Sequence, residues 1–209
     1  MHKIFSQLSQ SQLKQDIFVL FETEFKRNGY FVEFGATNGI SLSNTYLLEK
    51  HFDWSGILAE PATCWHPELL KNRSCAIELS AVYPISNQTV EFNQTPDQGL
   101  STIHAYTESG HGKDTRANGI KYPVNTISLM DLLAKYAAPN IIDYLSIDTE
   151  GSEFDILLNF DFDQYDIKII TCEHNYTDDR QRLFDLFTSK GYVRKYTNYT
   201  EFDDWYVKL

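Results

Sequence analysis

Cysteine and long apolar runs are scarce in this chain of 209 residues. Its three cysteines are odd in number and form no C-x-x-C pair, which is typical of reduced thiols rather than of a disulfide framework. No stretch approaches the ~20 apolar residues of a membrane-spanning helix. The first residues, MHKIFSQLSQSQ, are too polar for a secretion signal. We therefore expect a cytoplasmic protein that does not enter a membrane.

Basic residues are also few, with 18 lysines and arginines against 29 aspartates and glutamates, for a net charge of -11. Such a balance disfavours non-specific binding to nucleic-acid phosphates or to anionic membranes. Neither G-x-G-x-x-G nor G-x-x-x-x-G-K-[ST] occurs in the sequence. Their absence lowers the case for a dinucleotide-binding or phosphoryl-transfer protein.

Strand-like and helix-like patterns alternate along the chain, which favours a mostly parallel sheet. The core strands are expected at 30–35, 56–60, 75–82, 142–147 and 167–172, and helices at 13–25, 44–52, 67–71, 128–136, from 152 and from 177. We predict one α/β domain over residues 1–209, with a doubly wound sheet and helices on both faces. Residues 1–29 form a helical cover, and a closing hairpin at 192–196 and 204–207 adds an antiparallel C-terminal strand.

Residues 93–122 interrupt this alternation. The segment is polar, contains several glycines and has no sustained period. Long irregular loops within compact domains are usually functional or disordered. We expect a lid or an acceptor-binding loop, with a mobile surface excursion as the alternative.

The most informative stretch is YFVEFGATNG, residues 30–39, a buried strand that runs into a glycine-containing turn. Glu33 lies at its carboxyl end, where open α/β sheets bind ligands. A carboxylate there suits a cationic ligand, such as the amino group or sulfonium of S-adenosylmethionine, better than a phosphate. Glu60 follows at the end of the next strand, about 25 residues on, where an acid meets ribose hydroxyls in nucleotide-binding folds.

Other polar residues also fall at expected strand ends, so the sequence predicts a single cleft lined by acids. The end of the third strand carries Ser80, next to Ala81. Asp148 and Glu150 follow the fourth strand, and the run Glu173-His174-Asn175 follows the fifth.

The succession FVEFGATNGISLSNTYLLEK, GILAEP, VNTISLMDLL, IDYLSIDTEGSEFDIL, EHN and DDWYVK resembles the FkbM-type S-adenosylmethionine-dependent methyltransferases. The resemblance implies a Rossmann-like class I methyltransferase fold and methylation of hydroxyls on sugars or natural products. It also implies a set of cofactor-binding residues: Glu33, Gly35, Asn38 and Gly39 for the methionine end, Glu60 for the ribose, and Ser80 and Ala81 for the adenine. Asn44 and Asp148 are two further expected cofactor contacts. Thr37-Asn38 replaces the commoner aspartate after the Gly-Ala pair, which would shift a cofactor contact to Asn38.

A hydroxyl acceptor needs help in losing its proton, and His174 is the first candidate for the general base because neutral imidazole accepts a proton near pH 7. Asp148 and Glu150 are the alternatives. A divalent cation held by Asp148, Glu173 and His174 could instead lower the pKa of the hydroxyl. Nothing in the spacing requires a metal, so we predict a metal-independent site.

The expected partner is a glycan or a small molecule with a hydroxyl group. Methylation of a non-sugar metabolite or of a protein is the first alternative. A catalytically inactive, methyltransferase-like binding module is the second.

Overall fold

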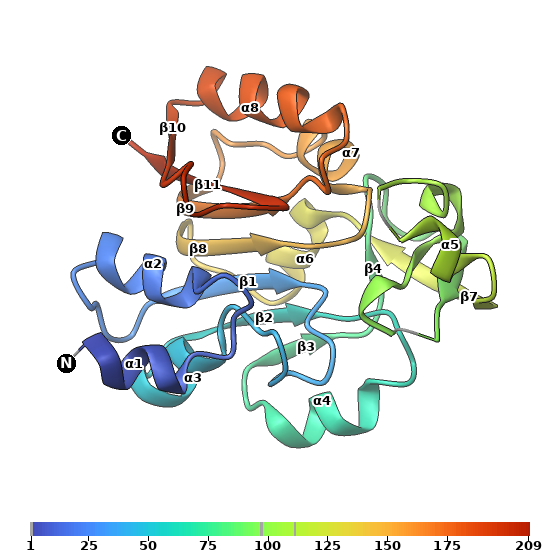
Figure 1. Ribbon diagram of the computed structural model, residues 1–209, viewed down its shortest axis with the longest axis horizontal. Helices are drawn as coiled ribbons and strands as arrows, with labels where there is room; N and C mark the ends of the chain where they lie inside the picture. The colour runs from blue at the N-terminus through green and yellow to red at the C-terminus, as the bar shows by residue number, and fades with distance from the viewer. Residues whose placement is uncertain (1, 97, 111) are drawn as a thin grey trace.

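The structure is a computed structural model that describes residues 2–96, 98–110 and 112–209 (Figure 1). Its main sheet has seven strands in the order β10-β11-β9-β8-β1-β2-β3. Their bounds are β1 Tyr30–Phe34, β2 Ser55–Ala59, β3 Ala76–Glu78, β8 Ile141–Ile147, β9 Asp166–Glu173, β10 Tyr192–Lys195 and β11 Asp203–Lys208.

Strand direction and order confirm the predicted fold class. Strands β1, β2, β3, β8 and β9 are joined by parallel pairs, whereas β11 runs antiparallel to both β9 and β10. The strand order reverses between β1 and β8, which is the point where doubly wound sheets bind ligands. This is the Rossmann-like arrangement of class I methyltransferases, with its antiparallel strand near the C-terminus.

Helices cover both faces of this sheet because successive strand residues point to opposite sides. Phe31 and Tyr144 pack in one buried cluster with α2 (Gln15–Glu22), α3 (Tyr46–Phe52) and α4 (His66–Asn72). Their neighbours Val32 and Leu145 pack in the other cluster, with the helices α6 Leu129–Lys135, α7 Glu153–Leu158 and α8 Asp179–Ser189. The first helix, α1 (His2–Leu8), lies beside α3 at the N-terminal side of the molecule (Figure 1).

A second sheet, in the order β4-β7-β5-β6, stands beside the first. It is made of β4 Ala81–Val82, β5 Thr89–Gln94, β6 Thr102–Ile103 and β7 Ile120–Ile127. The expected single strand over 75–82 is therefore wrong. The chain leaves the main sheet after Glu78, whose carboxylate accepts a hydrogen bond from the backbone N–H of Ser80, and it then pairs with β7.

Regular structure also occurs within residues 93–122, where the sequence shows no period. Besides the ends of β5 and β7 and the short β6, the segment contains η1 (Gln98–Leu100), η2 (His104–Tyr106) and α5 (Lys113–Arg116). These elements are too short for a hydrophobic period to be visible. Across the residues described above, no helix has the length and apolar character needed to cross a bilayer.

Candidate functional site

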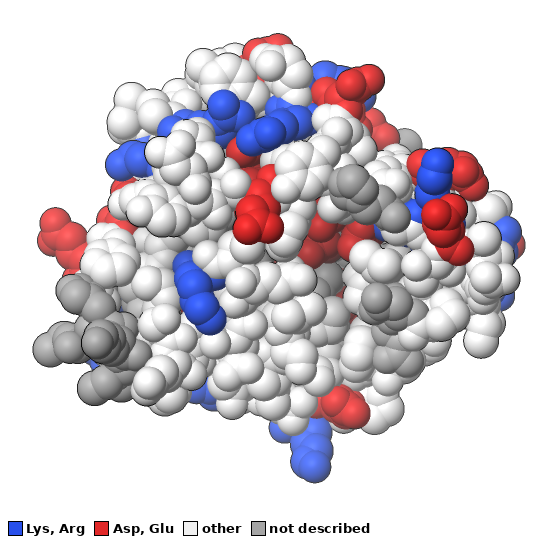
Figure 2. All heavy atoms as spheres, in the orientation of Figure 1, with Lys and Arg blue, Asp and Glu red and all other residues white. Residues whose placement is uncertain are grey.

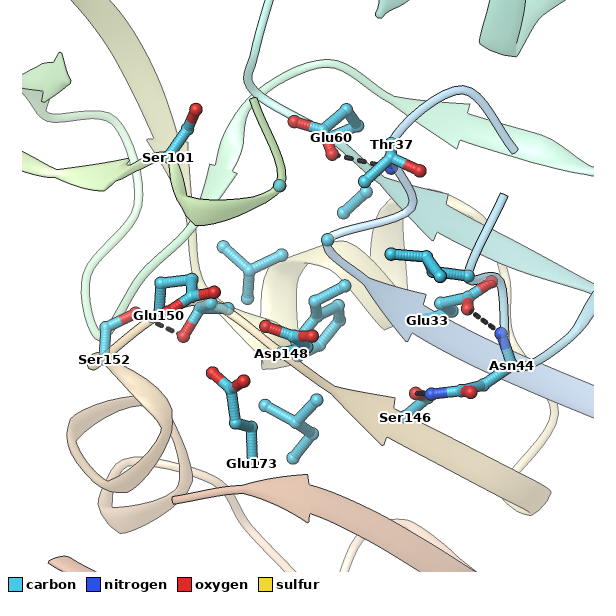
Figure 3. A pocket seen from close by; sticks show the side chains of 18 of the residues that line it. Glu33, Thr37, Asn44, Glu60, Ser101, Ser146, Asp148, Glu150, Ser152 and Glu173 are labelled. Atoms are coloured by element: carbon cyan, nitrogen blue, oxygen red, sulfur yellow. Dashed lines mark hydrogen bonds between the residues drawn. The ribbon is translucent and has the colours of Figure 1, made fainter. Parts of the chain in front are cut away.

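A cavity of about 340 Å³ opens at the carboxyl ends of β1, β2, β8 and β9. Glu33, Glu60 and Asp148 all line it, so the acidic strand ends do meet over one crevice (Figure 3). Its volume is that of a pocket for a small molecule or cofactor. In Figure 2 acidic side chains are recessed in a hollow near the middle of the face shown.

Glu33 is buried and fully engaged with the protein. Its carboxylate accepts hydrogen bonds from the hydroxyls of Ser43 and Thr45 and from the backbone N–H of Asn44, at 2.9, 2.5 and 2.6 Å. Burial raises the pKa of Glu33, although the guanidinium of Arg73, 3.8 Å away, acts in the opposite direction. Glu33 therefore stabilises the turn that follows β1 and positions Asn44.

Asn44 is held at the cavity wall by this turn. Its amide Nδ2 donates a hydrogen bond to the hydroxyl of Ser146 on β8, at 2.9 Å. The amide oxygen Oδ1 is buried and has no hydrogen-bond partner among the described residues. A buried acceptor left unpaired is costly, so a donor supplied by a ligand would complete it.

Asn38 and Gly39, two predicted cofactor residues, do not line the cavity. The side-chain oxygen of Asn38 accepts hydrogen bonds from the backbone N–H groups of Ile40 and Ser41, so it closes its own turn. Gly39 has a positive φ of 80° and packs against Arg73. Both residues shape the loop between β1 and α3.

Gly35 brings the end of β1 close to the end of β8. Its φ is 73°, and a Cβ at this position would lie 2.2 Å from the carbonyl oxygen of Asp148. Only glycine fits such a contact, because a side chain would collide with the backbone of the neighbouring strand. The floor of the cavity between Glu33 and Asp148 is consequently bare backbone.

Glu60 follows β2 and is almost completely buried at the opposite wall. Its two carboxylate oxygens accept hydrogen bonds from the backbone N–H groups of Thr37 and Ala62, at 2.8 and 2.7 Å. Burial raises the pKa of Glu60 to about 7. Each oxygen keeps a second lone pair, with which the carboxylate can accept from a diol.

Three further carboxyl groups gather at the other end of the cavity. Asp148 follows β8, Glu150 lies in the next turn, and Glu173 ends β9 (Figure 3). Burial is the main cause that raises all three pKa values, Asp148 and Glu173 well above their usual range and Glu150 to about 7. Repulsion among the acids adds to the effect of burial.

The carboxylate of Glu153 stabilises the turn that contains Glu150. It accepts hydrogen bonds from the backbone N–H groups of Thr149 and Gly151. Gly151 has a positive φ of 126°, as a turn glycine can adopt. The hydroxyl of Ser152, the residue before α7, donates to Thr149 and makes no capping hydrogen bond to the helix.

Arg116, on α5, connects residues 93–122 to the carboxyl cluster. Its guanidinium is buried and lies 2.6 Å from an oxygen of Glu150, and it also donates to the carbonyl oxygens of Leu100 and Ser109. The residues Leu100, Ser101 and Ile103 of the same segment line the cavity. The sequence analysis missed Arg116 because no local pattern indicates a partner 34 positions away.

His174 does not lie at the cavity wall. Thr171 and Glu173 of β9 and Asn175 of the following turn line the cavity, whereas His174 is not among the lining residues. The ring nitrogen Nδ1 accepts from the backbone N–H of Tyr176, and Nε2 lies 3.7 Å from Asp204. This is a packed, structural setting for the imidazole.

Of the two residues predicted to flank an adenine, only one lines the cavity. Ala81 lines the cavity together with Val82, whereas Ser80 is not among the lining residues. The cavity also includes side chains that the sequence did not indicate, namely Gln15 of α2 and Asp203 of β11. The amide of Gln15 donates to one oxygen of Asp203 at 2.9 Å, and the other oxygen of Asp203 is buried without a partner in the described chain.

The family profile described as the methyltransferase FkbM domain matches residues 33–209. No curated protein matches the chain. Among solved structures, a Pyrococcus horikoshii protein assigned as an RNA methyltransferase has a TM-score of 0.47, 10% identity and coverage of 94% of this chain and 83% of its own. Precorrin-6y C5,15-methyltransferase from Geobacter metallireducens has a TM-score of 0.46, 10% identity and coverage of 92% and 85%.

Those two structures are too distant to say anything about the substrate of this chain. The family profile is a stronger finding, since it extends from Glu33 at the end of β1 to the last residue and so takes in every acidic strand end of the cavity. The chain therefore belongs to the FkbM methyltransferase domain family.

Proposed function

We propose that this chain transfers a methyl group from S-adenosylmethionine to a hydroxyl group, on a sugar of a glycan or glycoconjugate. The observation that carries the proposal is the cavity itself, in which the buried carboxylate of Glu60 lies at one end and the carboxyl groups of Asp148, Glu150 and Glu173 lie at the other. When bound, S-adenosylmethionine supplies an electrophilic methyl group.

The residues present fit such a cofactor. Glu60 offers a buried carboxylate suited to a ribose diol, and the unpaired Oδ1 of Asn44 offers an acceptor for an amino group. Gly35 leaves the backbone bare between them. An acid-lined wall also favours a sulfonium over a phosphate-bearing ligand.

The hydroxyl acceptor is supported by the groups beyond Asp148. Gln15, Asn175 and Asp203 line that part of the cavity, and one oxygen of Asp203 is buried without a partner. These groups suit a neutral ligand that is rich in hydroxyl donors. A nucleic-acid acceptor is disfavoured because its phosphates would meet carboxylates.

We assign the handling of the acceptor's proton to the carboxyl cluster rather than to His174. Asp148 and Glu150 line the cavity and can contact an acceptor there, whereas the imidazole of His174 is packed against Asp204 outside it. A positioned carboxylate of this kind typically contributes ~100-fold or more to the rate.

The direct test is incubation with S-adenosylmethionine carrying a labelled methyl group and a panel of methyl-free glycans, followed by mass spectrometry. We expect label on a glycan hydroxyl, and turnover reduced at least ~100-fold in Asp148→Asn. The His174→Ala variant should keep turnover within a few-fold of wild type. A folded wild-type chain that binds S-adenosylmethionine but labels no glycan would reject the acceptor class, and collapse of turnover in His174→Ala alone would return the base to the imidazole.

A further inference from the structure

The carboxyl cluster is arranged as a ligand set. One oxygen each from Asp148, Glu150 and Glu173 lie within 4.8 Å of one another, although the residues come from two strand ends and a turn (Figure 3). Glu150 and Glu173 are buried and Asp148 is half-buried at the cavity wall. Three ionised carboxylates this close repel one another, so their charge must be offset by protons or by a cation.

The protein supplies only part of that compensation. In the described chain, Arg116 is the one basic side chain that forms an ion pair with any of the three acids, through Glu150 at 2.6 Å. Asn175 donates a further hydrogen bond to the same oxygen of Glu150, at 3.0 Å. If all three acids are ionised, as they would be around a bound metal, one guanidinium leaves two negative charges, which one divalent cation would neutralise.

Glu173 provides an independent sign that a ligand belongs here. The residue is 7% exposed, and its oxygen Oε2 is buried with no hydrogen-bond partner in the described structure. Its carboxylate points toward Asp148 and Glu150 in Figure 3. A buried, unpaired carboxylate oxygen is costly and is accounted for when it coordinates a cation.

From this arrangement we propose that Asp148, Glu150 and Glu173 form a binding site for one hard divalent cation of the Mg²⁺, Mn²⁺ or Ca²⁺ class. Three oxygens that share one Ca²⁺, at the 2.3–2.6 Å typical of this ion, can lie roughly 4–4.5 Å from one another, so three oxygens within 4.8 Å of one another are close to what the ion needs. Mg²⁺ binds oxygens at about 2.1 Å, so the three acids would have to close further around it. All donors are carboxylate oxygens, which these cations prefer to imidazole or thiolate.

The site differs from the metal set that the sequence suggested. Glu150 replaces His174, whose ring lies outside the cavity. The catalytic consequence rests on the proposed function: a cation beside the acceptor would lower the pKa of its hydroxyl and stabilise the alkoxide that forms. The carboxylates would then act by holding the cation, while the proton leaves to solvent.

Binding can be measured without any activity. The purified chain, stripped with a chelator and dialysed, is titrated with Mn²⁺ while electron paramagnetic resonance reports the free ion. We expect one Mn²⁺ per chain, and an affinity at least ~10-fold weaker in Glu173→Gln and in Asp148→Asn. Removing a direct ligand should weaken binding at least as much as removing a residue that only supports a ligand. Glu201→Gln, the same change at an exposed residue outside the cavity, should bind like wild type.

Thermal unfolding separates loss of the site from loss of the fold. In chelator, Glu173→Gln should be at least as stable as wild type, because it removes like-charge repulsion. Added Mn²⁺ should raise the melting temperature of wild type but not that of the variant. A folded wild type that binds no Mn²⁺, or equal binding by wild type, Glu173→Gln and Asp148→Asn, would overturn the site.

Experiments can reject the cation site and the methyl-transfer proposal independently of each other. Binding of S-adenosylmethionine is measured in chelator, where the cation plays no part. Cofactor binding without Mn²⁺ binding would overturn only the cation site. Mn²⁺ binding without cofactor binding would overturn only the proposed function.

Discussion

Replacing Arg116 by methionine removes the one guanidinium that joins residues 93–122 to the carboxyl cluster. The side chain is 1% exposed, and its three hydrogen bonds go to Glu150, Leu100 and Ser109. Breaking a buried ion pair from one side typically costs ~3–5 kcal/mol, because the partner charge is left uncompensated. For a chain of this size that corresponds to a fall in melting temperature of roughly 6–20 °C.

A double-mutant cycle shows whether the cost comes from Glu150. The single variant Arg116→Met, the single variant Glu150→Gln and the double variant are compared by urea and thermal unfolding, with chelator present throughout. If the uncompensated carboxylate is the cause, adding Glu150→Gln to Arg116→Met should recover ~1–3 kcal/mol. Hydrogen exchange should show that residues 93–122 lose protection first in Arg116→Met. A loss below ~1 kcal/mol in Arg116→Met, or strictly additive effects of Arg116→Met and Glu150→Gln, would show that the loss does not come from an uncompensated Glu150 carboxylate.

Two further predictions concern the opposite wall of the cavity. Gly35→Ala should lower the free energy of unfolding by at least ~1–2 kcal/mol for its left-handed backbone, and by more for the collision with Asp148. Gly191→Ala, at a residue with φ of 85° and open space around it, measures the backbone part alone. Equal losses in the two variants would show that the collision contributes nothing. Burial raises the pKa of Glu60 from 4.5 to about 7, so its ionisation penalises the folded state. The free energy of unfolding should therefore fall by up to about 3 kcal/mol as pH rises from 4.5 through 7. Glu60→Gln should not show this loss. If wild type and Glu60→Gln lose stability in parallel over this range, Glu60 is not the source of the loss.

Local sequence patterns were sufficient for the parallel sheet and its acidic strand ends. Apolar runs such as 142–147 predict the strands, and carboxylates lie at or near the carboxyl ends of these runs; three of them, Glu33, Glu60 and Asp148, do line one cavity. His174 follows the last residue of β9, so no strand alternation sets the direction of its side chain, and its place beside Asp204 depends on tertiary packing.

The features that the sequence did not reveal depend on contacts between distant residues. Strand β4 was merged with β3 because only its pairing with β7, more than forty residues later, separates the two. Arg116 and Asp203 join the site through tertiary packing that leaves no local period. Short elements such as β6 and α5 depend on that packing as well, which is why residues 93–122 looked irregular.

If the crevice over β1 and β2 holds S-adenosylmethionine, as proposed, calorimetric titration of the cofactor into the purified chain should detect it. We expect one molecule bound per chain, with roughly 10–100-fold weaker binding in Glu60→Ala, because hydrogen bonds to a charged group contribute ~1.5–3 kcal/mol each. Glu201→Ala should bind as wild type does, and thermal unfolding should show both variants folded. A folded wild-type chain that gives no heat of binding, or undiminished affinity in Glu60→Ala, would rule out a cofactor site at Glu60.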